Sequence, residues 1–251
     1  MKASAVYNFI DKLAPFNTAA GFDNSGFLIG SPDAEVSGIV VALDCTEKAI
    51  EKSIATNSNL IVTHHPLIFD PIKKIHSDSI IYKLIQNNIS LICAHTNLDY
   101  SKGGVNDVLC KRLGINKVKG YFPVGEDSFE LRAGELPYTF TADNLARYIK
   151  ERVGGYVRYS NCQKELKTVA VCSGSGGSML SNVATLEVDA YISGDIKHSV
   201  FLEAEQLGIA IFDAGHFNTE DIIVDPLCAE LSVAFPDTNI YPFHFYDVKT
   251  V

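Results

Sequence analysis

The chain has 251 residues, 47% of them hydrophobic and 20% charged, the composition of an ordinary globular protein with one large domain or two small ones. Its net charge of −9 argues against nucleic acid as a primary partner, because non-specific binding to phosphates depends on Lys and Arg. A small anionic substrate stays compatible with this charge if a metal supplies positive charge locally.

The N-terminus predicts a surface helix and no signal peptide. Val6, Phe9, Ile10 and Leu13 recur at helical spacing behind Ser4, a suitable N-cap. No segment approaches the ~20 apolar residues that span a bilayer, so we expect no membrane association. The six cysteines form no CxxC pair and several lie in apolar segments, which indicates buried, reduced thiols in a cytoplasmic protein.

Further along the chain, two halves repeat one order of elements. In the first half, apolar strands at 39–43, 60–63 and 90–94 alternate with helices near 46–55 and 79–86. In the second half, strands at 168–172, 190–193 and 208–212 alternate with helices near 178–185 and 198–206. The helix at 5–13 has a counterpart near 141–152, and a His-x-Asn-x-acid signature follows both third strands.

This duplication predicts an α/β protein of two pseudo-repeated α/β domains, with mixed, mainly parallel sheets that face a shared metal site. We place the domains at 1–124 and 125–251, because the run 120–127 breaks the pattern with Gly and Pro. The segments 115–123 and 239–245 could add edge strands, and the last strand could pack back on the first domain.

Metal-ligating side chains gather at the ends of these strands. Ligands of open α/β sheets bind beyond the carboxyl ends of strands, which is where His64, His65, Asp99, His216 and Glu220 lie. Imidazole and carboxylate suit zinc, manganese, iron or cobalt. Five ligands suit two ions about 3.5–4 Å apart that activate water, with Glu220 as a bridge. The alternative is that the histidines occur by chance and the acids cap helices.

Six segments stand out along the chain: Phe22–Gly30, Thr63–Phe69, Ala94–Asp99 with Gly103–Asp107, Ser173–Ser178, Ser193–His198 and Gly215–Glu220. They resemble the successive motifs of one family, the GTP cyclohydrolase I type 2 homologues, also called Nif-three-like dinuclear metal-centre hexameric proteins. The resemblance covers nearly the whole chain, in order, and matches the short form that has no inserted middle domain.

The resemblance implies a toroidal homohexamer with two divalent ions per subunit, facing its interior. His64, His65, Asp99, His216 and Glu220 correspond to the metal ligands of the family. The chain departs from the family pattern at two positions. Phe22 stands where Trp is usual, a conservative change, and Ser199 stands where a second His is frequent, which puts a His pair at 198 and 199 in doubt.

Other polar residues near the strand ends have two interpretations each. His95 is either a sixth ligand or a residue that orients one. Asp195 and His198 could act as acid, base or substrate contact, or else as a helix cap and a surface His. The loop 173–178 could cradle an anion or form a tight turn. Glu220, Asp195 and His198 are the residues we expect to take part in catalysis.

The sequence therefore predicts a metal-dependent hydrolase of a small nucleotide-like or phosphorylated compound. An alternative of another class is a non-catalytic metal-binding scaffold or regulatory ring protein. An open coordination position favours the enzyme, whereas a site closed by protein ligands favours the scaffold. Nucleic-acid binding inside a ring is a third interpretation, which the acidic composition opposes.

Overall fold

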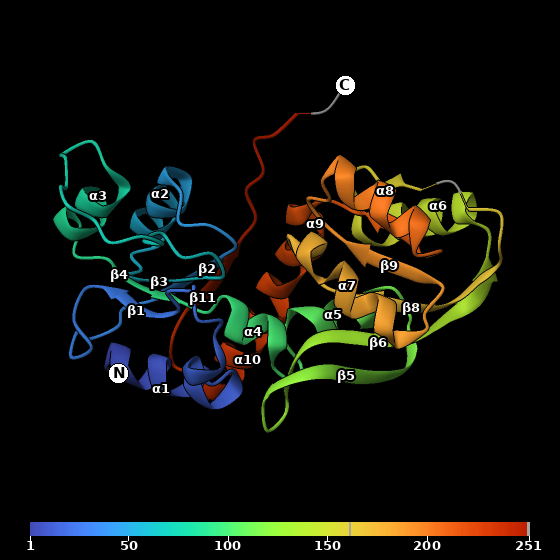
Figure 1. Ribbon diagram of the computed structural model, residues 1–251. Helices are drawn as coiled ribbons and strands as arrows, with labels where there is room; N and C mark the ends of the chain where they lie inside the picture. Colours follow the sequence, from blue (N-terminus) through green and yellow to red (C-terminus); the bar gives the residue numbers. More distant parts are fainter. Residues whose placement is uncertain (161, 250–251) are drawn as a thin grey trace. The chain divides into compact units, whose positions relative to one another are not determined.

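A computed structural model describes residues 1–160 and 162–249 (Figure 1). Its contacts divide the chain into two compact units, Met1–Ser101 with Ile223–Val251, and Lys102–Ile222. This division differs from the boundary expected after residue 124. A cut there would open the antiparallel hairpin of β5 (Asn116–Gly125) and β6 (Ser128–Phe140). Asn161, Thr250 and Val251, which the second predicted domain includes, lie outside the described residues.

The first unit is built on a five-stranded sheet of order β1-β4-β3-β2-β11. The pairs among β4, β3, β2 and β11 are parallel, and β1 is antiparallel to β4. In chain order, its elements are α1 (Ala3–Leu13), η1 (Phe16–Thr18), β1 (Gly26–Ile29), β2 (Ile39–Ala42), α2 (Glu47–Ala55), β3 (Leu60–Thr63), α3 (Ile80–Gln86), β4 (Ser90–Cys93), α4 (Thr96–Tyr100), α10 (Val224–Ala234) and β11 (Ile240–Phe243).

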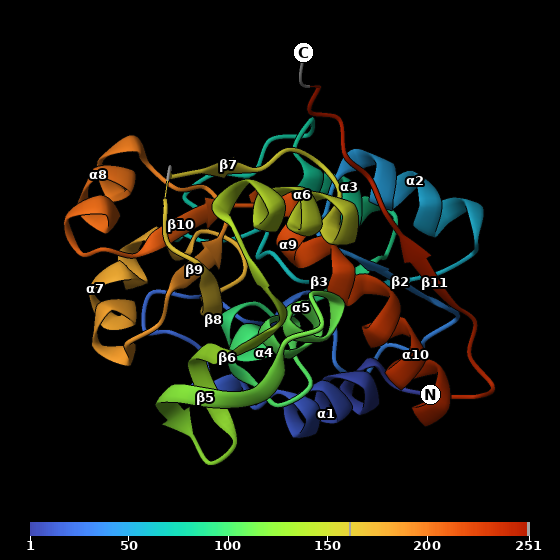
Figure 2. The ribbon, with the colours of Figure 1, turned by 90° about the vertical axis from the view of Figure 1, so that its right-hand side faces the viewer.

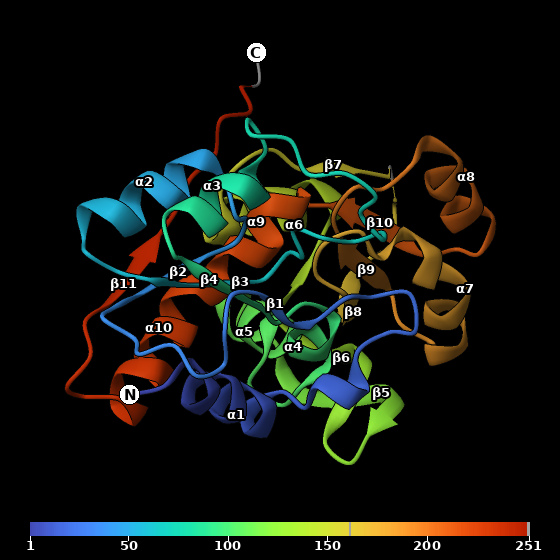
Figure 3. The same ribbon diagram turned by 90° about the vertical axis from the view of Figure 1, so that its left-hand side faces the viewer.

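Both faces of this sheet are covered by helices, which explains its continuously apolar strands. All four residues of each of β2, β3 and β4 are buried. Val40, Ile61 and Leu91 are aligned across the strands and pack into one cluster with α2 and α3. Helices α1 and α10 lie on the opposite face (Figures 1 and 3). Thr46 and Ser79 cap α2 and α3 by accepting backbone N–H bonds, as their residue types predict.

The second unit is built on a six-stranded sheet of order β5-β6-β8-β9-β10-β7. Strands β8, β9 and β10 are parallel, and the pairs outside them are antiparallel. Besides β5 and β6, its elements in chain order are α5 (Val105–Arg112), which precedes β5, and then α6 (Ala142–Val153), β7 (Arg158–Tyr159), β8 (Leu166–Val171), η2 (Gly176–Met179), α7 (Leu180–Val183), η3 (Ala184–Leu186), β9 (Ala190–Ser193), α8 (His198–Gln206), β10 (Ala210–Asp213) and α9 (His216–Glu220). The short helix η4 (Asp221–Ile223) follows α9.

Successive residues of these parallel strands face two separate cores. Ala170, Tyr191 and Ile211 pack with α7 and α8. Their neighbours Val171, Ile192 and Phe212 pack with α5 and α6, and Figure 2 shows the two helix pairs on opposite faces of the sheet. Alternation along a strand therefore fills both cores, and the strand ends are left to carry the polar residues.

The predicted fold class is confirmed, and each predicted strand and helix of the duplication is present within a few residues. The two segments expected as edge strands are β5 and β11. The sequence did not predict that the His-x-Asn-x-acid segments would be short helices, α4 and α9. In the described part of the chain, no helix combines the length and the apolar character of a membrane span.

Asp23 holds the segment before β1 against the end of β4. Its carboxylate has no exposed surface and accepts bonds from His95 Nδ1 (2.8 Å), Ser25 Oγ (2.8 Å) and Thr96 Oγ1 (2.6 Å). Burial alone would raise the pKa of Asp23, but these hydrogen bonds outweigh it and hold the pKa well below its ordinary value. The ionised carboxylate is therefore part of the folded structure.

We expect Asp23→Asn to lower the free energy of unfolding at pH 7 by about 2 kcal/mol, because a charged acceptor of several bonds becomes neutral. A carboxyl whose pKa is depressed by folding stabilises above its unfolded pKa of about 3.9 and loses this effect as the pH falls below it. The difference between the proteins should thus shrink below about pH 4. Urea unfolding of both proteins with chelator present would measure it, and a difference that does not depend on pH would contradict this account.

Candidate metal centre

Three histidines of the first unit lie together at the carboxyl ends of β3 and β4. His64 and His65 follow β3 directly, and His95 follows β4. Ring centroids are 5.1 Å apart for His64 and His65, 5.2 Å for His64 and His95, and 5.7 Å for His65 and His95. One ring nitrogen from each lies within 4.8 Å of the others. Three imidazole nitrogens at this spacing form a group that could hold a metal ion.

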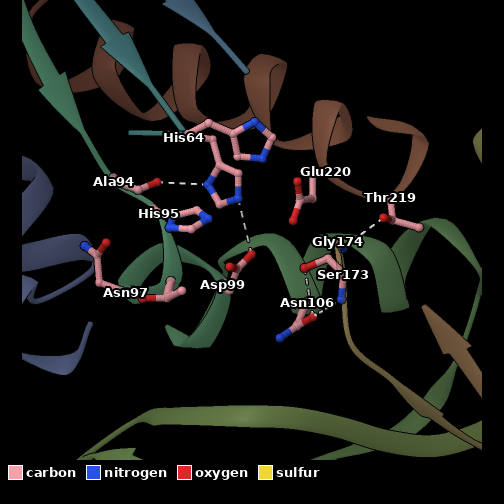
Figure 4. A network of polar contacts seen from close by, with 12 residues as sticks. His64, Ala94, His95, Asn97, Asp99, Asn106, Ser173, Gly174, Thr219 and Glu220 are labelled. Carbon is pink, nitrogen blue, oxygen red and sulfur yellow. Dashed lines mark hydrogen bonds and ion pairs between the residues drawn. The ribbon is translucent and has the colours of Figure 1, made fainter. Parts of the chain in front are cut away.

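Each of these rings is fixed by an oxygen at its Nδ1 atom. His64 Nδ1 lies 2.9 Å from the carbonyl oxygen of Ala94, His65 Nδ1 lies 2.8 Å from Asp44 Oδ1, and His95 Nδ1 lies 2.8 Å from Asp23 Oδ1 (Figure 4 shows the His64 bond). A carbonyl or carboxylate oxygen only accepts, so each Nδ1 carries the proton and donates it. In the neutral ring Nε2 then has no proton and carries a lone pair, which is the form of the ring that binds a metal through Nε2.

Asp99 lies on α4, one helical turn after His95, and its Oδ1 atom is 3.5 Å from His64 Nε2. His64 is 1% exposed and Asp99 is also buried. Because His64 donates through Nδ1, a neutral His64 presents its Nε2 lone pair to a carboxylate oxygen. Two acceptors that face each other in a buried place fit a cation that binds both.

The second unit carries a matching pair on α9. His216 and Glu220 stand four residues apart, hence on one face of the helix, with His216 Nε2 2.8 Å from Glu220 Oε2. His216 Nδ1 lies 2.8 Å from Asp195 Oδ2. Both ring nitrogens thus face carboxylate oxygens. If Nδ1 donates its proton to Asp195, the contact between Nε2 and Glu220 requires either a second proton on the ring or a cation that both atoms bind. The donor set fits a metal here as well.

Gly174 makes room for the Glu220 carboxylate. A Cβ atom at this position would lie 1.9 Å from Glu220 Oε1 and 3.3 Å from His216 Nε2, and the φ angle is +60°. Gly174 N donates to Thr219 Oγ1 at 3.0 Å, and its neighbour Ser173 donates from N to Asn106 Oδ1 at 2.8 Å (Figure 4). The close approach of Glu220 accounts for this glycine. Anion binding by the loop 173–178 stays a prediction.

Asp195 and His198 line two different hollows. Asp195 borders one of about 300 Å³, together with Ser175, Ser178 and Lys197. His198 is the exposed first residue of α8 and borders another of about 590 Å³, with Tyr159 and Phe201. The bond to His216 gives Asp195 a place beside the candidate ligands. The acid–base role expected of His198 stays a prediction.

Two supporting contacts were not predicted from the sequence: Asp44, which fixes His65, and the bond between Asp23 and His95. Asp44 follows the residue after β2, so an acid at the carboxyl end of a buried strand was the available signal. Asp23 lies in the motif segment Phe22–Gly30, but nothing in the sequence joined it to His95, which is 72 residues away. His95 itself is held by Asp23 and belongs to the histidine group, so it can act as ligand or as support.

Comparison with known proteins identifies relatives over the whole chain. The model of the family Duf34/NIF3 (NGG1p interacting factor 3) matches residues 1–250. A "GTP cyclohydrolase 1 type 2 homolog" of Clostridium perfringens is 36% identical, over 88% of this chain and 87% of that protein. One of Campylobacter jejuni is 36% identical over 92% of both chains.

A solved structure shows the same fold. The crystal structure of the Staphylococcus aureus hypothetical protein SA1388 matches with a TM-score of 0.90 and 28% identity, covering 98% of this chain and 97% of that chain. The match of the family model covers the six motif segments that carry the resemblance in sequence. The chain belongs to the Duf34/NIF3 family.

Proposed function

We propose that this protein is a metal-dependent hydrolase that holds two divalent cations. The ligands are His64, His65, Asp99, His216 and Glu220. The observation that carries the proposal is how the rings are held: His64, His65 and His216 each have an oxygen acceptor at Nδ1, which in a neutral ring makes Nε2 the atom that would bind a metal. Nitrogen with carboxylate oxygen suits zinc, manganese, iron or cobalt.

The residues around the ligands set their protonation and direction. The Ala94 carbonyl and the carboxylates of Asp44 and Asp195 hold the protons on Nδ1. Glu220, 3% exposed, has an acceptor oxygen beside His216 Nε2 and suits a bridging ligand. When bound, a pair of cations lowers the pKa of water and neutralises charge that develops on substrate oxygens.

The substrate class we propose is a small nucleotide-like or phosphorylated compound. Two features support this class: the net charge of −9, which disfavours polymeric nucleic acid, and the printed name of the bacterial relatives. The proposed cation pair would attract a small anion. In this proposal Asp195 influences catalysis through His216, whose Nδ1 atom lies 2.8 Å from its Oδ2 atom. A protein that binds metal but hydrolyses no compound of a panel of nucleotides and phosphoesters would support the alternative role as a metal-binding scaffold.

We propose further that the protein is cytoplasmic and assembles as a homohexamer. All six cysteines are free and four are buried, as expected of a reducing compartment. Exposed apolar side chains of the first unit, such as Phe22 and Phe69 with ring centroids 6.2 Å apart, supply surface that self-association would bury. Light scattering after size-exclusion chromatography measures the number of chains, and a monomer would contradict the assembly.

We expect His64→Ala and Glu220→Ala to reduce bound metal from about two ions per chain to one or fewer. Each variant removes one ligand from a centre that shares the others. His76→Ala is the matched control for the first unit, because His76 is an exposed loop residue. Elemental analysis by mass spectrometry measures the metal, and circular dichroism verifies the fold. Wild-type metal content in either ligand variant would refute that assignment.

We expect Gly174→Ala to weaken metal binding at least about tenfold, because the added Cβ displaces the Glu220 carboxylate. Gly208→Ala separates this clash from backbone strain. Gly208 also has a positive φ angle, +70°, but among the described residues, its chain neighbours apart, no atom lies within 4 Å of the place that its added methyl group would take. Both variants should lose stability, by about 1–2 kcal/mol. Only Gly174→Ala should lose metal affinity in a chelator competition, and equal affinities would contradict the role of this close approach.

Hydrolysis itself is tested on a panel of nucleotides and phosphoesters, with metal-loaded and chelator-treated protein. We expect turnover of at least one nucleotide-like compound, abolished by chelator and by His65→Ala, and restored by added metal in the wild type only. The Nε2 atom of His65 is the ligand atom that this variant removes. Turnover that survives both treatments would contradict a metal-dependent reaction.

A further inference from the structure

Asp213 is a buried carboxylate at the end of β10, three residues before His216. It is 1% exposed, yet both of its oxygens are engaged. Oδ1 accepts the backbone N–H of Gly215 at 3.0 Å, and Oδ2 accepts the backbone N–H of Ile196 at 3.1 Å. A buried carboxylate with this many bonds has one defined position, and the backbone groups that it binds are held in place with it.

The two amides that Asp213 holds belong to the turns that carry Asp195 and His216. Gly215 has a φ angle of +82° and leads into α9, so its bond fixes the direction in which His216 leaves the strand. Ile196 directly follows Asp195, which has a φ angle of +49°, a conformation that costs free energy outside glycine. The bond from Ile196 to Asp213 stabilises this turn.

Arg158 completes the arrangement from the neighbouring strand. In the β7–β10 ladder it is the direct partner of Asp213. Its Nε and Nη2 atoms both donate to Asp213 Oδ2, and Nη2 also donates to the carbonyl oxygen of Ile196 at 2.6 Å. Both backbone polar atoms of Ile196 are therefore bound, the N–H by Asp213 and the carbonyl by Arg158. The guanidinium also neutralises the buried carboxylate.

We propose that Asp213 and Arg158 form a positioning pair, which aligns the Asp195 turn with the His216 turn so that Asp195 Oδ2 meets His216 Nδ1. These turns follow different strands, β9 and β10, and Asp213 binds both. The consequence for metal affinity rests on the proposed function, in which His216 is a ligand. The alignment of the two turns does not depend on it.

Asparagine at this position keeps the size of the side chain and removes its second acceptor. Its amide NH₂ group would face an N–H of Gly215 or of Ile196, so at least one of the two amides would lose its bond. The charge that pairs with Arg158 would also be lost. Asp213→Asn should therefore loosen the two turns without creating a cavity.

Asp189→Asn is the matched control. Asp189 precedes β9, at the opposite end of that strand from Asp195, and its Oδ2 atom accepts the backbone N–H groups of Lys167 (3.0 Å) and Thr168 (2.9 Å). It thus performs the same kind of double-amide bonding in the same unit, through contacts that do not include the turns of Asp195 and His216.

The experiment combines hydrogen–deuterium exchange of the metal-free protein with Zn²⁺ titration against a chromogenic chelator. In Asp213→Asn we expect exchange of the Ile196 and Gly215 amides to rise about tenfold or more, and Zn²⁺ affinity to fall about 10- to 100-fold. In Asp189→Asn we expect faster exchange at Lys167 and Thr168 instead, with Zn²⁺ affinity within twofold of the wild type.

Unchanged exchange at both amides in Asp213→Asn would overturn the positioning role. Faster exchange with unchanged Zn²⁺ affinity would overturn its consequence for the ligand. If the wild type itself binds neither Zn²⁺ nor Mn²⁺, Fe²⁺ or Co²⁺ in the same titration, the proposed function fails, and the exchange data still decide whether Asp213 holds the two turns.

Arg158 supplies a second variant in case Asp213→Asn does not fold, since its side chain is 52% exposed and its removal disturbs the core less. Arg158→Met should speed exchange at Ile196 and weaken Zn²⁺ binding, and Arg158→Lys should restore part of both, because it keeps the charge that faces Asp213. Wild-type exchange and affinity in Arg158→Met would remove Arg158 from the pair.

Discussion

The candidate centre depends on hydrogen bonds that fix each imidazole ring at its Nδ1 atom. His64, His65, His95 and His216 all place Nδ1 against an oxygen that can only accept. Since a neutral imidazole carries one proton, these bonds decide which nitrogen keeps its lone pair. They also stop rotation of the ring, so the lone pair has one direction. A His in an open loop has neither property, and this separates the group from surface residues such as His76.

The fold supplies those oxygens through the ends of its parallel strands. Buried strands bring their carboxyl ends to one edge, where the chain must turn and polar groups are tolerated. The Ala94 carbonyl and the Asp44 carboxylate both lie just past such ends. The short helix α4 then places Asp99 four residues after His95, its N-cap residue, and α9 places Glu220 one turn after His216 on the same face. Each unit thus contains this arrangement once: a buried strand ends, a short helix follows, and a His and an acid stand four residues apart.

The two units stabilise this arrangement of strand end and short helix with different residues, although the order of elements repeats. In the first unit Asp23, from the segment before β1, bonds His95 and Thr96 after β4. In the second unit Asp213, within β10 itself, bonds the turn that carries Asp195 and the turn that leads into His216. Both carboxylates are buried and both are bonded several times, as a buried charge requires. The two copies therefore share the backbone arrangement and differ in the buried residues that support it.

The sequence by itself determined the repeated order of strands and helices, because apolar runs of four or five residues between capped helices admit few other structures. It also determined the residue types of the candidate ligands, since histidines and acids recur after the same strands. Only the tertiary structure decided that Ala94, Asp44 and Asp195 fix the rings, that Gly174 must lack a side chain, and that β5 and β6 stay in one unit. These features join residues that are far apart in the chain, and local propensity and periodicity carry no information about such contacts.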